Sequence, residues 1–160
     1  MVYDCITLKT NLFNDQRGTF SELYKFSNLQ NFVCKQVNFS SSHKGTLRGL
    51  HLAPYAKLVT CIAGQIFDVC LDLREDSPTY LKYFSARLGP NQNNNQIYIP
   101  ANCAHGFLSV TDSVIVYAQD GEYSKDKDKA VCYKNYGVEW PENPTIISEK
   151  DSQVCKQNNR

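Results

Sequence analysis

Three histidines are the side chains of this chain best suited to moving a proton near neutral pH. They are His43, His51 and His105, and each follows or precedes small or turn-forming residues. If the chain folds into a barrel, its strands can bring His51 and His105 into one cavity, as acid, base or hydrogen-bond donor. The alternative for each is a half-buried structural ring.

A metal centre is the other chemistry that histidines support, and it needs three or four converging ligands. A His-x-His pair on one strand would supply two of them, but the residue two positions after His51 is Ala53. His105 and His43 do not restore that pair. We therefore expect no metal and no cofactor.

Seven cysteines are scattered along the chain without a Cys-x-x-Cys pair. The first residues, MVYDCITLKTNLF, lack a basic start followed by a long apolar run, so the sequence predicts no secretion signal and a cytoplasmic location. Cytoplasmic cysteines are normally reduced, and we expect most of these, Cys103 included, to be small core residues. A zinc site or a catalytic thiol is the alternative.

Charged residues stand at the ends of predicted strands, where the mouth of a barrel would lie, although a solvated surface is the simpler interpretation of most of them. They are Arg17, Glu22, Arg48, Lys57 and Lys150. Arg48 is the exception because it is close to His51. Residues three apart on a regular strand point to opposite faces, and a bulge or bend at Gly49 is one way for both to reach one site.

The hydrophobic pattern predicts short strands with turn residues roughly every 8–12 positions. Gly64 divides the densest apolar run, 58–73, into two buried strands. The other predicted strands are 2–8, 18–24, 32–39, 80–88, 97–99, 106–110 and 114–117. Short helices are expected only at 26–31 and after Ser148. This pattern favours an all-β jelly-roll barrel with short peripheral helices.

Length and charge limit the number of domains and the possible partners. The chain has 160 residues, of which 17 are basic and 16 acidic. The length suits a single domain over residues 1–160, with a polar tail after Val154 that we expect to be flexible. Balanced charge argues against a nucleic-acid surface, and no run approaches the roughly 18 apolar residues of a membrane helix.

Several short strings follow one another along nearly the whole chain. They are DQRGTFSE (15–22), QVNFS (36–40), KGTLRGLH (44–51), KLV (57–59), GQIFDV (64–69), DLR (72–74), SPTY (77–80), AHGF (104–107) and SEKD (148–151), together with Tyr117 and Tyr123. In this order they resemble the dTDP-4-dehydrorhamnose 3,5-epimerase family. Each string alone is a weak signal, whereas the ordered set is specific.

The resemblance implies a cupin-type barrel, a homodimer, and an isomerase that acts without metal on a nucleotide-diphospho-sugar. By this resemblance His51 is the catalytic base and Asp151 its carboxylate partner. Tyr117 is the general acid on the opposite face of the sugar, and Lys57 lies beside the sugar and diphosphate.

The resemblance also implies a set of substrate-binding residues. They are Arg17, Phe20, Glu22, Gln36, Asn38, Arg48, His105, Tyr123 and Lys150. Tyr123 would stack on the nucleotide base, and Lys150 would bind the nucleotide end. The strand that carries Arg17 would reach into the neighbouring subunit.

The chemistry of a 4-keto-6-deoxy sugar fits these roles. The C4 ketone acidifies the hydrogens at C3 and C5, because the carbanion delocalises onto the C4 oxygen. A neutral histidine such as His51 can remove one, and a carboxylate such as Asp151 can orient the histidine. Inversion needs a second group across the ring, for which Tyr117 is suited, and Lys57 is the candidate donor to the enolate oxygen.

The chain departs from the family pattern directly after His51. The family carries a longer segment there, usually with Gln-x-Pro-Pro and another Gln, whereas only residues 52–56 separate His51 from Lys57. The sugar, the nucleotide and the number of inverted centres therefore stay open. The alternatives are a single-centre epimerase of a GDP- or CDP-linked sugar, a sugar 3,4-ketoisomerase, and a non-catalytic sugar-binding barrel.

Overall fold

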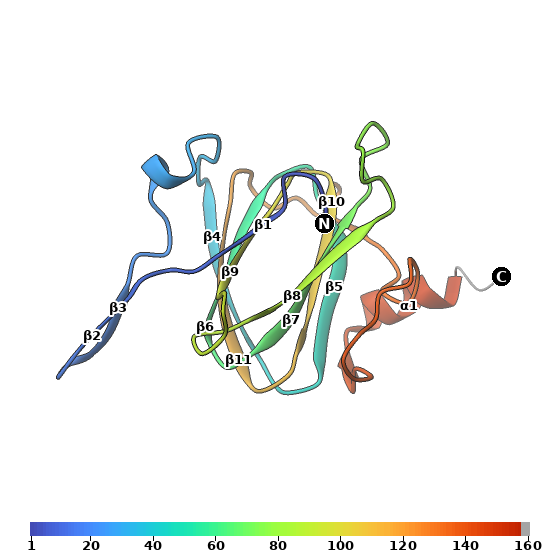
Figure 1. Ribbon diagram of the computed structural model, residues 1–160. Coiled ribbons are helices and arrows are strands. Elements are labelled where there is room, and N and C mark those ends of the chain that lie inside the picture. The colour runs from blue at the N-terminus through green and yellow to red at the C-terminus, as the bar shows by residue number, and fades with distance from the viewer. Residues whose placement is uncertain (158–160) are drawn as a thin grey trace.

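The computed structural model describes residues 1–157, most of which form two β-sheets that face each other (Figure 1). The first sheet has the strand order β1 (Ile6–Leu8), β9 (Gln96–Ile99), β6 (Lys57–Ala63), β11 (Ser113–Gln119), β4 (Gln36–Ser42). The second has the order β12 (Lys129–Ala130), β5 (Thr46–Leu52), β10 (Cys103–Ser109), β7 (Ile66–Asp72), β8 (Tyr83–Leu88), and β13 (Ile146–Ile147) pairs with β5. Most neighbours are distant in sequence, as in a jelly roll, which confirms the all-β prediction.

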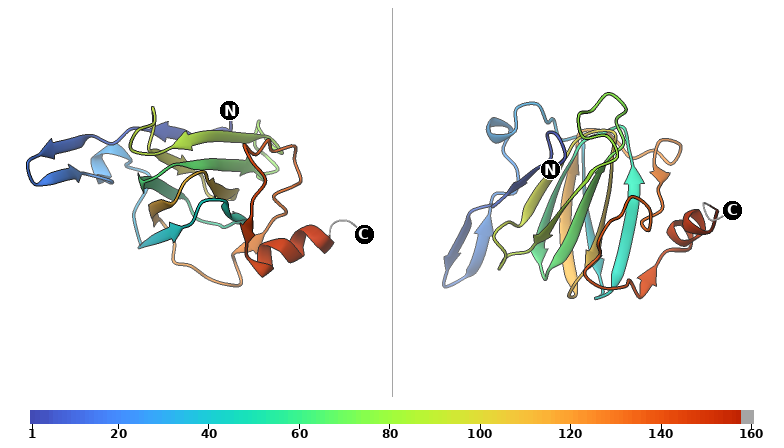
Figure 2. Two further views of the ribbon diagram at one scale, coloured as in Figure 1. Left: turned by 90° about the horizontal axis from the view of Figure 1, so that it is seen from below. Right: turned by 45° about the vertical axis from the view of Figure 1, so that its right-hand side comes forward.

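The remaining elements lie outside the two sheets. β2 (Leu12–Asp15) and β3 (Gly18–Ser21) form a hairpin that projects away from the body of the molecule (Figure 1). A 3-10 helix, η1 (Phe26–Asn28), follows it. The helix α1 (Glu149–Gln157) packs beside β5 and β12, on the outer side of the second sheet (Figure 2).

Both faces of the second sheet are covered, so its central strands are apolar on both sides. One buried cluster lies between the sheets and includes Val59 and Ile115 of the first sheet with Cys70 and Phe107 of the second. The other cluster lies on the outer face, where residues 131–155 cover β5, β7 and β10. This double burial explains why β7 and β10 lack the alternation of a half-exposed strand.

The strand predictions are confirmed where the apolar pattern is strong. Gly64, with a φ of 73°, makes the predicted turn between β6 and β7. The predicted strands do not include β5, or the short strands β2, β12 and β13. The short strands contain too few residues to show a hydrophobic period. No helix within residues 1–157 is long and apolar enough to span a membrane.

Two expectations about the end of the chain are wrong. The helix α1 continues to Gln157, so residues 155–157 are ordered rather than flexible, and the remainder of that predicted tail, 158–160, lies outside the described residues. Cys132 and Cys155 form a disulfide, so not all seven cysteines are reduced thiols. The other five are free, and four of these are buried.

Candidate active site

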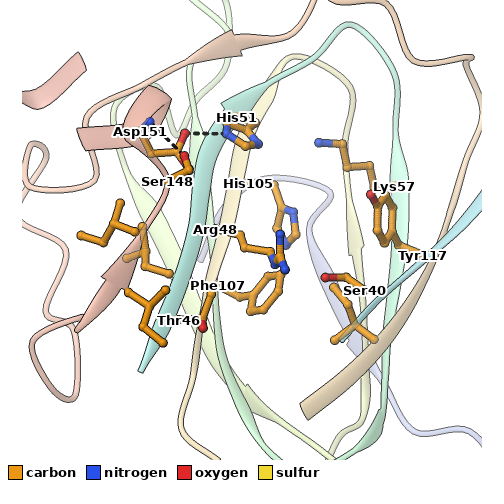
Figure 3. A pocket seen from close by; sticks show the side chains of 14 residues that line it. Ser40, Thr46, Arg48, His51, Lys57, His105, Phe107, Tyr117, Ser148 and Asp151 are labelled. Atoms are coloured by element: carbon orange, nitrogen blue, oxygen red, sulfur yellow. Dashed lines mark hydrogen bonds and ion pairs between the residues drawn. The ribbon is translucent and has the colours of Figure 1, made fainter. Parts of the chain in front are cut away.

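A cavity of about 480 Å³ lies between the two sheets, within the size range of small-molecule sites. Figure 3 shows the side chains that line it. Six of the residues proposed from the sequence are among them, namely Arg48, His51, Lys57, His105, Tyr117 and Asp151. Ser40, Phe107 and Ile115 contribute further polar and apolar surface.

His51 and Asp151 form a hydrogen-bonded pair on one wall of the cavity. The Nε2 atom of His51 lies 2.8 Å from Oδ1 of Asp151, and Oδ2 of Asp151 accepts the Gly49 N–H at 3.3 Å. Burial raises the pKa of Asp151, but the hydrogen bonds and the charge of His51 outweigh it, so the pKa stays below its ordinary value. Asp151 is therefore a carboxylate that can fix the histidine tautomer and stabilise an imidazolium.

The start of α1 places this carboxylate. The Ser148 hydroxyl accepts the N–H of Asp151 at 3.1 Å, which is the N-cap arrangement expected for Ser-Glu-Lys-Asp. Asp151 then stands in the first turn of α1, which packs against β5, and its side chain points at His51 (Figure 3).

A bulge on β5 turns both Arg48 and His51 toward the cavity. In the pairing with β10, His51 stands opposite His105 and Arg48 opposite Phe107, so two residues of β5 face Gly106 alone. A Cβ atom on Gly49 would lie 2.7 Å from the Gly106 Cα atom, so the two backbones approach this closely only without side chains. The predicted irregularity at Gly49 is thus confirmed.

Tyr117 and Lys57 stand on the opposite wall, on the neighbouring strands β11 and β6 of the first sheet (Figure 3). Burial raises the pKa of the Tyr117 hydroxyl, and the charge of Arg48 opposes this only in part. Tyr117 is therefore a protonated donor at neutral pH. Burial also lowers the pKa of Lys57, although nearby carboxylates, first of all Asp128, favour its charged form.

His105 belongs to a second His–Asp pair, which the sequence does not reveal. Its Nε2 atom lies 2.8 Å from Oδ2 of Asp68, a fully buried residue of β7. Within residues 1–157 the Oδ1 atom of Asp68 has no hydrogen-bond partner. The available signal was a carboxylate inside an apolar strand, because such a charge is stable in a core only when it is paired.

Three of the proposed binding residues lie on or beside the projecting hairpin and do not line the cavity. Arg17 has an 85% exposed side chain and pairs with Asp15 at 2.6 Å. Phe20 is also exposed, and Glu22 pairs with Lys25. In this single chain, no part of the hairpin lines the cavity.

The other four do not line the cavity either, and three of them are joined by hydrogen bonds. Gln36 donates from its amide to Asn38 at 2.9 Å, and its carbonyl oxygen accepts the Tyr123 N–H at 2.8 Å. Lys150 donates to Asp128 at 3.0 Å. Tyr123 and Lys150 are both largely exposed.

The described part of the chain contains no cluster of side chains suited to binding a metal ion. Among residues 1–157, no group of three or more His, Cys, Asp or Glu side chains is arranged to hold a metal ion. His43 is exposed, outside the cavity, and lies near Asp112.

Several known proteins that resemble this chain in sequence and fold are nucleotide-sugar epimerases. The model of the family described as dTDP-4-dehydrorhamnose 3,5-epimerase matches residues 1–158. The enzyme of that name from Shigella flexneri is 37% identical over 160 residues, which cover 92% of this chain and 88% of the relative.

Solved structures agree with the sequence match. An RmlC epimerase of Mycobacterium tuberculosis has a TM-score of 0.87 at 31% identity, over 98% of this chain and 88% of that one. The RmlC of Legionella pneumophila, solved with dTDP-4-keto-L-rhamnose, has a TM-score of 0.83 at 30% identity, over 91% and 83%. The fold is thus the cupin-type jelly roll of these epimerases, and the chain belongs to the dTDP-4-dehydrorhamnose 3,5-epimerase family.

Proposed function

We propose that this chain inverts C3 and C5 of a dTDP-linked 4-keto-6-deoxyhexose, of the dTDP-4-dehydro-6-deoxyglucose type. The observation that carries the proposal is that His51 and Tyr117 face each other across one cavity, from different sheets (Figure 3). A flat keto-sugar ring between them would lose a proton on one side and regain one on the other. The Legionella relative, solved with a dTDP-linked keto sugar, supports the substrate class.

In the proposed reaction, His51 removes the proton from the carbon next to the C4 ketone. Because Nε2 is bonded to Asp151, Nδ1 is the atom that accepts the proton, and the Asp151 carboxylate stabilises the resulting imidazolium. The negative charge moves to the C4 oxygen, where the Lys57 ammonium stabilises it. Tyr117 then donates its proton to the opposite face of the carbon, which completes the inversion.

Arg48 and His105 are proposed to hold the sugar and the diphosphate. Arg48 is oriented by hydrogen bonds to the Ser42 hydroxyl at 2.9 Å and the Ser41 carbonyl oxygen at 3.2 Å. His105 is oriented by Asp68. Fixed donors of this kind suit a phosphate group, because they lose little freedom when it binds.

The nucleotide end of the substrate is proposed to lie near Tyr123 and Lys150. The exposed ring of Tyr123 is available to stack on the base. The Lys150 ammonium is near enough to interact electrostatically with Tyr123, and this interaction favours the charged form of the lysine. Gln36 and Asn38 border the same region through the Gln36 hydrogen bond to Tyr123.

The proposed assembly is a homodimer in which the hairpin β2–β3 packs on the neighbouring subunit. The hairpin exposes Phe13 and Phe20, and a two-stranded hairpin standing alone is marginal in water. The edge strand β4 exposes Val37 and Phe39 as well. In this assembly Arg17, Phe20 and Glu22 would reach the partner's cavity.

Two broader proposals concern the whole chain. A single domain over residues 1–160 is supported by the family match over residues 1–158. A cytoplasmic location is supported by five free cysteines, while the Cys132–Cys155 disulfide stands against it.

The test of the reaction is a panel of nucleotide-linked 4-keto sugars incubated with the enzyme in deuterated water and followed by NMR. We expect deuterium at both C3 and C5 of the dTDP-linked sugar, with inversion at both. Deuterium at one carbon alone would identify a single-centre epimerase, and a migrated ketone would identify an isomerase. Binding without any exchange would contradict an enzymatic role.

A further inference from the structure

The ammonium of Lys57 is buried, and no carboxylate within residues 1–157 forms an ion pair with it. The residue is 8% exposed, and burial lowers its pKa. The charged or titratable groups that favour its charged form are Asp128, Asp68 and Cys70. Asp128 is bonded to Lys150 at 3.0 Å and Asp68 to His105 at 2.8 Å, so each carboxylate already has another partner.

The group in contact with the Lys57 ammonium is an aromatic ring. The Nζ atom lies over the face of Tyr55, 5.7 Å from the ring centroid. The face of an aromatic ring carries negative potential, so at this distance it attracts a cation, and more strongly where water is excluded. Tyr55 itself is only 7% exposed.

The ring of Tyr55 is held by the turn that follows β11. A Cβ atom on Gly121 would lie 2.8 Å from the Cβ atom of Tyr55, so Tyr55 occupies space that only a glycine leaves open. The Ala56 N–H donates to the Asp120 carboxylate at 2.7 Å, and the Asp120 N–H donates to the Ala56 carbonyl oxygen at 3.2 Å. These contacts fix the short segment 53–56 beside the cavity.

We propose that Tyr55 is a positioning residue, whose ring face holds the Lys57 ammonium, charged and directed into the cavity. Tyr55 belongs to the segment between His51 and Lys57, which is shorter here than in the family pattern. In this chain the contact with Lys57 therefore comes from the shortened segment itself. The inference rests on the proposed function in one respect, which is that Lys57 stabilises the enolate. Tyr55 does not line the cavity, so it acts through Lys57 rather than on the substrate.

The experiment compares Tyr55→Leu, which removes the ring face, with the conservative Tyr55→Phe, which keeps it. The pKa of Lys57 is read by NMR on protein labelled with carbon-13 at the lysine ε position, with Lys57→Arg to assign the signal. We expect Tyr55→Leu to lower the Lys57 pKa further, and to lower kcat roughly three- to thirtyfold with a smaller change in KM. Tyr55→Phe should retain both properties to within about threefold.

A third variant keeps the shape of the ring but removes its negative face. Pentafluorophenylalanine at position 55, introduced by nonsense suppression, fills the same space and should behave like Tyr55→Leu, which keeps the test valid if the leucine variant folds poorly. Equal Lys57 pKa and kcat in the phenylalanine and pentafluorophenylalanine proteins would overturn the inference. A lowered Lys57 pKa with full turnover would uphold the contact and refute the role of Lys57 in the proposed function.

Discussion

His51 and His105 stand opposite each other on neighbouring strands, but their carboxylate partners differ in position. Asp68 belongs to the fully buried part of β7, and the His105 side chain is only 10% exposed. The His51 side chain is 30% exposed, while its partner Asp151 is buried in α1. The more open pair is suited to proton exchange with a ligand, and the closed pair is suited to holding one in place.

At this scale, replacement of the proposed base has a clear expected outcome. His51→Asn should reduce epimerisation by roughly 10²–10⁴-fold, because the asparagine amide cannot accept the proton, while substrate binding persists. Calorimetric binding and NMR turnover measure the two properties separately. His43→Asn, at an exposed position outside the cavity, is the control and should match the wild type. Normal turnover in His51→Asn would rule out this residue as the base.

The pH dependence of turnover follows from the two groups on the opposite wall. Burial lowers the pKa of Lys57 toward neutral pH and raises the pKa of Tyr117 away from it, so Lys57 is the group expected to titrate as the pH rises. We expect the basic limb of kcat to reflect Lys57. In Lys57→Arg the charge persists at high pH, so this limb should move upward, whatever the absolute rate. If the basic limb of kcat stays at the same pH in Lys57→Arg, a group other than Lys57 is responsible for it.

Residue positions were predictable where short-range sequence fixes them. The spacing of Arg48, Gly49 and His51 indicated a bulge or bend at Gly49 as one way for both side chains to share a site, and the register shift between β5 and β10 confirms it. Asp68 was missed, since an apolar strand predicts burial but not which buried group pairs with a histidine. The ring contact of Tyr55 depends on Gly121, which is distant in sequence, so local patterns carry no trace of it.

At the scale of elements, α1 depends on three attachments to the rest of the chain. Asp151 bonds to His51, Lys150 pairs with Asp128, and Cys155 is joined to Cys132. The predicted helix after Ser148 is confirmed. It was predictable because its capping residue is local in sequence. The disulfide was not predictable, because pairing depends on where distant segments meet in the fold.

Loss of the disulfide should therefore affect both stability and activity. The bridge spans 23 residues, and closing a loop of this size contributes about 3 kcal/mol. In a domain of this length that corresponds to a Tm lower by roughly 6–12 °C in Cys132→Ser/Cys155→Ser. Turnover should fall as well, because α1 carries Asp151. The reductant-treated wild type should resemble the variant, and Cys34→Ser should not. If the double variant keeps the wild-type Tm, the bridge does not form.

At the scale of the whole molecule, the hairpin β2–β3 is the element that stands apart from the two sheets. It extends away from the sheets (Figure 1), and it exposes the side chains of Phe13, Phe20 and Arg17 to solvent. In the proposed homodimer its contacts would belong to another copy, and no hydrophobic pattern within one chain predicts where such an arm lies in an assembly. The strands themselves hold a regular register from Leu12↔Ser21 to Asp15↔Gly18.

Mixed dimers test whether Arg17 acts in the partner's cavity. Arg17→Ala and His51→Asn chains, each expected to be weakly active alone, are co-expressed with different tags. Each mixed dimer would hold one complete cavity, with His51 from one chain and Arg17 from the other. With random pairing, activity should return to about a quarter of the wild-type value. No recovery in purified mixed dimers would show that Arg17 does not act across the interface.

The separation of His51 and Asp151 by 100 residues has a consequence during synthesis on the ribosome. Translation delivers the histidine 100 residues before its carboxylate, so a nascent or prematurely released chain that ends before α1 holds an imidazole without its carboxylate partner. Such a product lacks the group that orients the ring and stabilises its protonated form. In the proposed reaction, His51 therefore gains its full strength as a base only after synthesis has passed α1.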